Sequence, residues 1–143
     1  MTLAAAAATS GRGGGAAACR PGIHRVGGVK VRAYCGPAAA RVRQAGRLVT
    51  FHGGSCMRVA NVFTVSVGTV TFSRRPRFRY FRATVAGTGA TFKNPIVAWQ
   101  YAGRRFVLAR GTLRLAADRR HGTFWGRLAR TRGFVSGSFA CRA

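Results

Sequence analysis

The sequence predicts an all-β protein, an antiparallel β-sandwich or small barrel built of hairpins, behind a disordered N-terminal segment. Three observations lead to this prediction. Apolar and polar residues alternate with a period of two in most runs after residue 28, as in strands with one buried face. Turn signals separate these runs at a spacing of about 8–12 residues. No stretch predicts a helix, because the alanine runs are flanked by Gly and Pro.

The first 27 residues are low in complexity, and we assign 1–27 to a signal remnant or linker before a single all-β domain at 28–143. The apolar run at 3–8 is too short to cross a membrane, and GRGGG interrupts it. No apolar run reaches about 18 residues, so no transmembrane segment is predicted.

The strands of the first half follow in order. Valine alternates with basic residues at 29–32, and RLVTFH at 47–52 ends at the Gly-Gly turn at 53–54. In NVFTVSV at 61–67, Phe and Val share one face, and TVTF follows at 69–72 as a further strand.

The second half continues the pattern. The predicted strands are 79–85, 96–101, 104–110, 112–117, 123–130 and 135–141. Their inward positions predict one core, made of Val65, Phe81, Trp99, Leu113, Phe124 and Phe139. Gly-Thr begins several runs, at 68–69, 87–88, 111–112 and 122–123. We expect each of these glycines to supply a positive φ in a turn.

The charge is the unusual property of the chain. There are 25 Lys and Arg residues against one acid, Asp118, and the formal net charge is +24. A polyanion binder would have this balance. A GC-rich genome would explain the excess of Arg over Lys, but it explains the near absence of acids less well.

The last strand, RGFVSGSF at 132–139, partly matches an RNA-recognition strand. However, Ser136 stands where that motif places a stacking aromatic, and no helices are predicted to cover the sheet. We interpret it as a core strand, with Val135 and Phe139 inside and Gly137 allowing close approach.

One carboxylate excludes a paired acid and base and a hard-metal site. Asp118 is expected to be a turn residue paired with Arg119 or Arg120. His24, His52 and His121 are expected to be surface or loop residues with no acidic residue to orient them. No Gly-rich phosphate loop is present. We therefore predict no catalytic residues, no metal and no cofactor.

The densest basic and aromatic stretch is 74–82. Its candidate polyanion-binding residues are Arg74, Arg75, Arg77, Arg79 and Arg82. Two interpretations apply to this stretch. It can be a groove whose rings stack on a ligand, or a hairpin loop, SRRPR, leading into a strand whose arginines face water. The hairpin-loop interpretation is favoured over the stacking groove. The stretch is still the best candidate for electrostatic attraction of a polyanion.

Four cysteines allow three disulfide connectivities. There is no Cys-x-x-Cys pair, which argues against a zinc site. An even number of cysteines in a small all-β chain indicates an oxidising compartment.

Several short motifs point to one group of proteins. They are GGSC at 53–56, FTV at 63–65, GT at 68–69, RYF at 79–81, VAWQ at 97–100, GTFWG at 122–126 and SGSFAC at 136–141. From Val49 to Cys141 the chain resembles small secreted proteins of high-GC actinobacteria. It is more distantly similar to β-domains of mycobacterial lipoprotein antigens, which close their fold with a terminal cysteine. The resemblance implies export and a disulfide between Cys56 and Cys141, and it implies no catalytic residues.

We also expect Cys19 to pair with Cys35, because both lie before the regular strands. The sequence thus predicts an extracellular or cell-surface, non-enzymatic β-domain with a binding or structural role. The alternative is a non-specific electrostatic binder of an anionic polymer, such as a cell-wall polymer or nucleic acid. An enzyme is the least favoured alternative.

Overall fold

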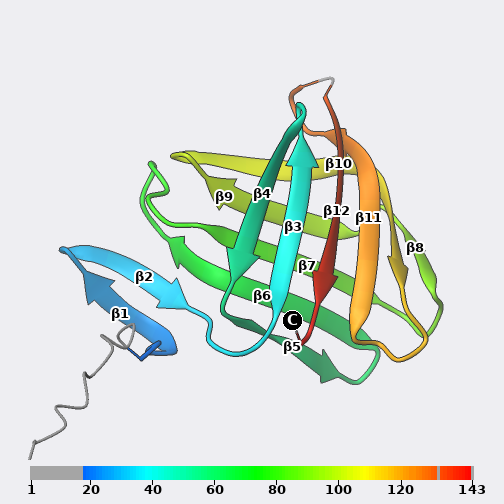
Figure 1. Cartoon of the computed structure of the whole chain (residues 1–143), viewed down its shortest axis with the longest axis horizontal. Helices are drawn as coiled ribbons and strands as arrows, with labels where there is room; N and C mark the ends of the chain where they lie inside the picture. The colour runs from blue at the N-terminus through cyan, green and yellow to red at the C-terminus, as the bar shows by residue number, and fades with distance from the viewer. Residues whose placement is uncertain (1–17, 132, 143) are drawn as a thin grey trace, which may run out of the picture.

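A computed structural model describes residues 18–131 and 133–142 of the chain. These residues form twelve strands and no helix, as the all-β prediction requires (Figure 1). The strands are β1 (Gly22–Val26), β2 (Val29–Ala33), β3 (Ala39–Gln44), β4 (Arg47–His52), β5 (Gly54–Val59), β6 (Val62–Thr71), β7 (Tyr80–Ala86), β8 (Thr91–Lys93), β9 (Ile96–Tyr101), β10 (Arg104–Leu115), β11 (His121–Leu128) and β12 (Phe134–Ala140).

β1 falls within the N-terminal region that the sequence assigned to a signal remnant or linker, and it pairs with β2. Residues 1–17, most of the segment predicted to be disordered, lie outside the described residues. Within the described part of the chain, no helix is long and apolar enough to span a membrane.

All twelve strands belong to one antiparallel sheet. The hydrogen-bonded order is β1-β2-β6-β7-β9-β10-β11-β12-β3-β4, with β5 added to β6 and β8 to β10. Figure 1 shows β4, β3, β12 and β11 lying across β6, β7 and β9, so the sheet is folded over on itself. The finer choice between a sandwich and a small barrel stays a prediction.

The long strand β10 connects the two halves of the folded sheet. Its first part, Arg104–Val107, pairs with β9, and its later part, from Leu108 to Leu115, pairs with β11. The sequence predicted two strands here, divided before Gly111, and that division is wrong. The strand does not end there: its register with β11 shifts between Leu108 and Arg110, as at a β-bulge, and β10 continues to Leu115.

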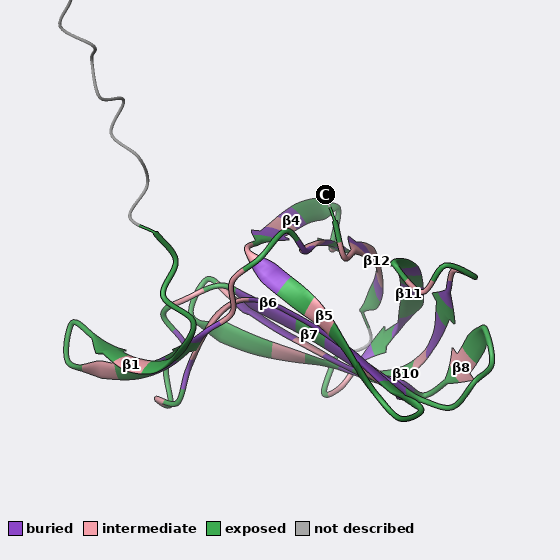
Figure 2. Cartoon of the chain, turned by 90° about the horizontal axis from the view of Figure 1, so that it is seen from below, coloured by how far each residue is buried: buried purple, intermediate pink, exposed green. Residues whose placement is uncertain are grey.

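The core lies between the two halves of the sheet. Seen from below, buried stretches of β6, β7 and β10 face β4, β12 and β11 (Figure 2). All six predicted core residues are buried in one cluster, which confirms that prediction. The ring of Phe81, on β7, lies 5.6 Å from that of Phe124, on β11, and so joins the two halves.

The Gly-Thr prediction is only half confirmed. Gly87 has a positive φ in the bend after β7, as expected. Gly68 also has a positive φ, but it lies inside β6, so the two strands predicted at 61–67 and 69–72 are one continuous strand. Gly111 and Gly122 do not have a positive φ. Those two glycines lie inside strands, where a side chain would collide with a neighbour: Leu108 at Gly111, and the ring of Phe139 at Gly122. Close packing, and not a turn, requires glycine at both places.

β12 has the inward face that the sequence predicted. Val135 and Phe139 are buried. A methyl group on Gly137 would collide with the carbonyl oxygen of Arg41 and the ring of Phe124, so the expected close approach is confirmed. Arg132, the first residue of the RNA-like motif, lies outside the described residues.

Two disulfides are present, and both match the expected pairs. Cys56–Cys141 joins β5 to the residue after β12, with 5.5 Å between the Cα atoms. Cys19–Cys35 joins the segment before β1 to the residues after β2. None of the four cysteines is a free thiol.

Candidate functional site

The five arginines proposed as a polyanion site lie in different settings. Arg74, Arg75 and Arg77 are exposed in the loop between β6 and β7. Arg79 reaches across to β4, where its Nη1 donates a hydrogen bond to the carbonyl oxygen of Thr50 at 3.2 Å. Arg82 lies on the outer face of β7, beside Tyr80. The loop therefore presents three of the five guanidinium groups as one sequence-local cluster.

The base of this loop is held in place by hydrogen bonds. Arg105 on β10 donates from Nη2 to the carbonyl oxygens of Thr71, at 2.9 Å, and Ser73, at 3.1 Å. Ser73 Oγ donates to the carbonyl oxygen of Arg75 at 2.6 Å, and Pro76 is buried. The loop is thus anchored while its arginines stay exposed.

The aromatic residues of the same stretch do not form a row of exposed rings for stacking, since Phe78 alone among them is partly exposed. Phe81 is fully buried, and Tyr80 is 8% exposed. Burial raises the pKa of Tyr80 to about 12, with a further upward contribution from Tyr34, while Arg82 and Ser66 act in the opposite direction. Tyr80 is therefore a neutral, packed side chain, which leaves electrostatic attraction as the role open to this stretch.

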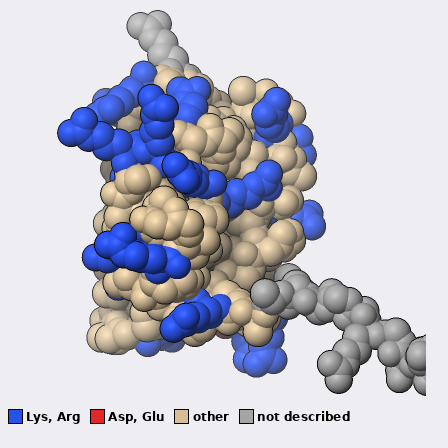
Figure 3. Space-filling model, turned by 90° about the vertical axis from the view of Figure 1, so that its left-hand side faces the viewer, with Lys and Arg blue, Asp and Glu red and all other residues tan. Residues whose placement is uncertain are grey.

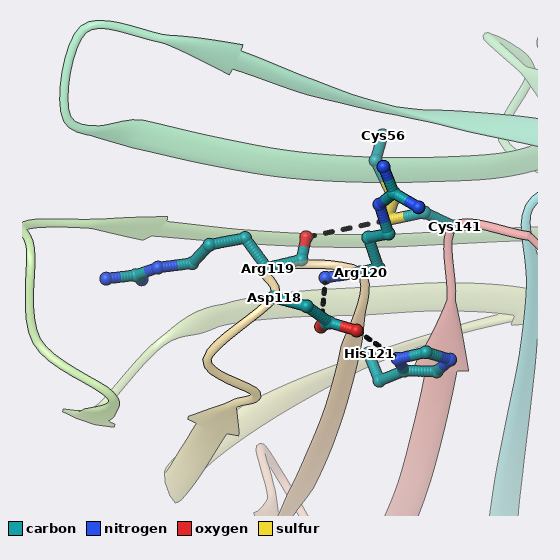
Figure 4. Close-up of polar contacts among 6 residues, drawn as sticks. All are labelled: Cys56, Asp118, Arg119, Arg120, His121 and Cys141. Atoms are coloured by element: carbon teal, nitrogen blue, oxygen red, sulfur yellow. Dashed lines mark hydrogen bonds and ion pairs between the residues drawn. A yellow bond between two sulfur atoms is a disulfide. The ribbon is translucent and has the colours of Figure 1, made fainter.

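The single carboxylate lies in the turn between β10 and β11 (Figure 4). Asp118 is a turn residue paired with Arg120, as predicted, but it also contacts His121, contrary to the expectation that no histidine has an acidic partner. Its Oδ1 accepts a hydrogen bond from the backbone N–H of Arg120 at 2.9 Å, and its Oδ2 lies 3.3 Å from His121 Nδ1. The Arg120 N–H and the His121 imidazole together hold the pKa of Asp118 below its usual range.

This turn is attached to the Cys56–Cys141 disulfide. The backbone N–H of Cys141 donates to the carbonyl oxygen of Arg120 at 2.8 Å. The sulfur of Cys141 lies 3.8 Å from the carbonyl oxygen of Arg119 (Figure 4). The Asp118–His121 pair has no thiol to activate, because Cys141 is disulfide-bonded. Among the described residues, no group of His, Cys, Asp and Glu could hold a metal ion.

A concave surface that the sequence did not indicate runs along the outer face of β12. Two adjoining cavities, of about 580 and 400 Å³, share Arg41, Thr123 and Ser138 in their walls. We call them together the β12 groove. Its residues are Ala39, Ala40, Arg41, Arg43, Leu48, His52, Arg114, Ala116, His121, Gly122, Thr123, Phe124, Trp125, Ser136, Gly137, Ser138, Phe139 and Ala140.

Strand alternation explains the groove. Because Val135 and Phe139 point into the core, the side chains of Ser136, Ser138 and Ala140 lie on the outer face of β12. These small side chains form the floor. Larger side chains of the flanking strands form the walls.

The strand register places the walls beside the floor. Ser138 lies between Thr123 on β11 and Arg41 on β3. In the same way, Ser136 lies between Trp125 and Arg43. The groove thus brings together residues that are distant in the sequence and adjacent only in the sheet.

Comparisons of this chain with protein-family models, curated proteins and solved structures found no match.

Proposed function

We propose that this protein is a secreted or cell-surface, non-enzymatic β-domain that binds anionic polymers through its positive charge, with little sequence preference. The observation that carries the proposal is the balance of 25 basic residues against one carboxylate. That carboxylate is already engaged by Arg120 N–H and His121. The basic side chains therefore have almost no internal counter-charge and attract external anions.

The distribution of charge supports a polymer as the ligand. Figure 3 shows Lys and Arg side chains at several separate places on one side of the molecule, with no Asp or Glu visible among them. A broad positive surface of this kind favours a ligand that carries many anionic groups, because each contact releases counterions.

The disulfides support a location outside the cytoplasm. Both bonds join segments that the fold places side by side, and disulfides persist mainly in oxidising compartments. An anionic cell-wall polymer is the kind of partner that such a compartment would offer.

The test is the salt dependence of affinity for duplex DNA, heparin and a teichoic acid. If about six phosphates are contacted, log affinity for duplex DNA should fall with log salt concentration at a slope near −5. Heparin and teichoic acid should compete with DNA, because the attraction depends on charge and not on bases. A salt-independent affinity, or a clear preference for one DNA sequence, would contradict the proposal.

A further inference from the structure

We propose that the β12 groove is the principal binding site and that its ligand is a single chain of an anionic glycan. This inference rests on the proposed function and gives it a location and a ligand class.

The shape of the groove fits one extended chain. Its floor is a single strand, and its walls stand on the strands to either side, which places them roughly 10 Å apart at the base. Ser136, Ser138 and Ala140 follow one another along one face, so the floor is about 13 Å long. A single polymer chain can lie in a groove of this width. A nucleic-acid duplex is too wide to enter it and could contact only its edges.

The charge of the groove is complementary to an anionic chain. Arg41 and Arg43 stand on one wall, and Arg114 stands on β10 beyond the other. All three side chains are exposed. Within the described residues, none of the three forms a hydrogen bond or ion pair, so their donors are open to a ligand. Asp118 does not line the groove, and it is paired with His121, which does.

The lining favours a glycan over single-stranded nucleic acid. Sites for single strands use successive aromatic side chains on which the bases stack. Here the floor is Ser136, Ser138 and Ala140, and the one exposed aromatic of the lining is Trp125, 37% exposed. Serine hydroxyls both donate and accept hydrogen bonds, as glycan hydroxyls do. Trp125 supplies one flat apolar face, enough for one sugar ring.

The test compares two variants that lose the same charge. One is R41S/R43S/R114S, in the groove, and its matched control is R74S/R75S/R77S, in the β6–β7 loop. The probes are a heparin oligosaccharide and a single-stranded oligonucleotide of the same formal charge. We expect the groove variant to lose about tenfold in affinity for the oligosaccharide, and the loop variant only about twofold to threefold.

A second pair of variants leaves the charge unchanged. Ser138→Tyr places a ring on the floor of the groove, whereas Ala86→Tyr places one on an exposed position of β7. Both positions are in strands, which tolerate tyrosine. We expect Ser138→Tyr to weaken oligosaccharide binding by about tenfold and Ala86→Tyr to leave it unchanged, with the denaturant midpoints of both variants close to that of the parent protein.

The outcomes separate this inference from the proposed function. Equal losses of affinity in the two charge variants, or no effect of Ser138→Tyr on affinity, would show that the groove is not the binding site. The proposal of charge-driven binding would still stand. A larger effect of the groove variant on the oligonucleotide than on the oligosaccharide would overturn the glycan assignment. If the parent protein binds neither probe in a salt-dependent way, the proposed function itself is wrong.

Discussion

Phe134 and Phe139 lie on the same strand, yet the first is 61% exposed and the second 3%. They are separated by an odd number of positions, so their side chains point to opposite faces of the sheet. Phe139 packs in the core, where its ring lies 5.9 Å from Phe63 and 6.4 Å from Phe81. At the residue scale, the face on which a side chain lies decides how much it contributes to stability.

This difference predicts a contrast between two substitutions. Phe139→Ala should lower the free energy of unfolding by about 3–5 kcal/mol, because it removes a buried ring and leaves a cavity. Phe134→Ala, its matched control on the same strand, should change it by about 0.5 kcal/mol or less. Denaturant titration measures both. An unchanged midpoint for Phe139→Ala would mean that the register of β12 is wrong.

Such residues could be predicted because alternation is local. Trp99 and Phe124 stand at inward positions of runs whose pattern is complete within a few residues. The pairing of Asp118 with Arg120 was predicted, but its contact with His121 was not, because a turn can bring a carboxylate to a backbone N–H and an imidazole as easily as to a guanidinium.

At the element scale, the sequence predicts strands better than it predicts their breaks. Glycine signals both a turn and a close approach, so the sequence predicts a break between two strands at Gly111, although β10 continues through it. β3 was not predicted, because its AARVRQ sequence follows Gly and Pro and begins with alanine, which is a poor strand former. β5 was not predicted either, because it follows the Gly-Gly signal of a turn.

The β12 groove could not have been predicted from local patterns. It exists because β12 lies between β11 and β3, and the pairing of strands that are distant along the chain leaves no periodic signal. The sequence pointed instead to 74–82, where the basic residues are contiguous. In the structure, that stretch divides between an exposed loop, a contact with β4 and the outer face of β7.

The two disulfides should differ in their effect on stability. Cys56–Cys141 closes a separation of 85 positions and Cys19–Cys35 one of 16. Restriction of the unfolded chain therefore gives upper values of about 4–5 and about 3 kcal/mol. We expect C56S/C141S to lower the denaturant midpoint more than C19S/C35S. Non-reducing peptide mapping of the parent protein checks the pairing, and a peptide linking Cys56 to another cysteine would refute it.

At the scale of the whole molecule, a net charge of +24 makes the folded chain repel itself. Salt screens this repulsion, since the Debye length falls to about 8 Å at physiological ionic strength. We predict that the thermal midpoint rises with sodium chloride, by about 4 °C for each kcal/mol gained. Heparin should raise it further at the same ionic strength, because a ligand that binds the folded state stabilises it.

Calorimetry at increasing salt, with and without heparin, measures both effects. A thermal midpoint that falls or stays constant with salt would show that the positive charges are too far apart to oppose folding. Sucrose, which strengthens burial without screening charge, is the control.

The position of β12 also sets the order in which the molecule can assemble during its synthesis. β3 and β4 are made before β5, but β12, which lies between β3 and β11 in the sheet, is made only after β11. Until then the inward face of the β3–β4 hairpin, with Val42 and Phe51, has only a partial covering, and one edge of β3 stays unpaired. The folded sheet therefore cannot be completed until β12 has been made, and a chain that stops before Phe134 would hold an open sheet edge that can pair with another copy.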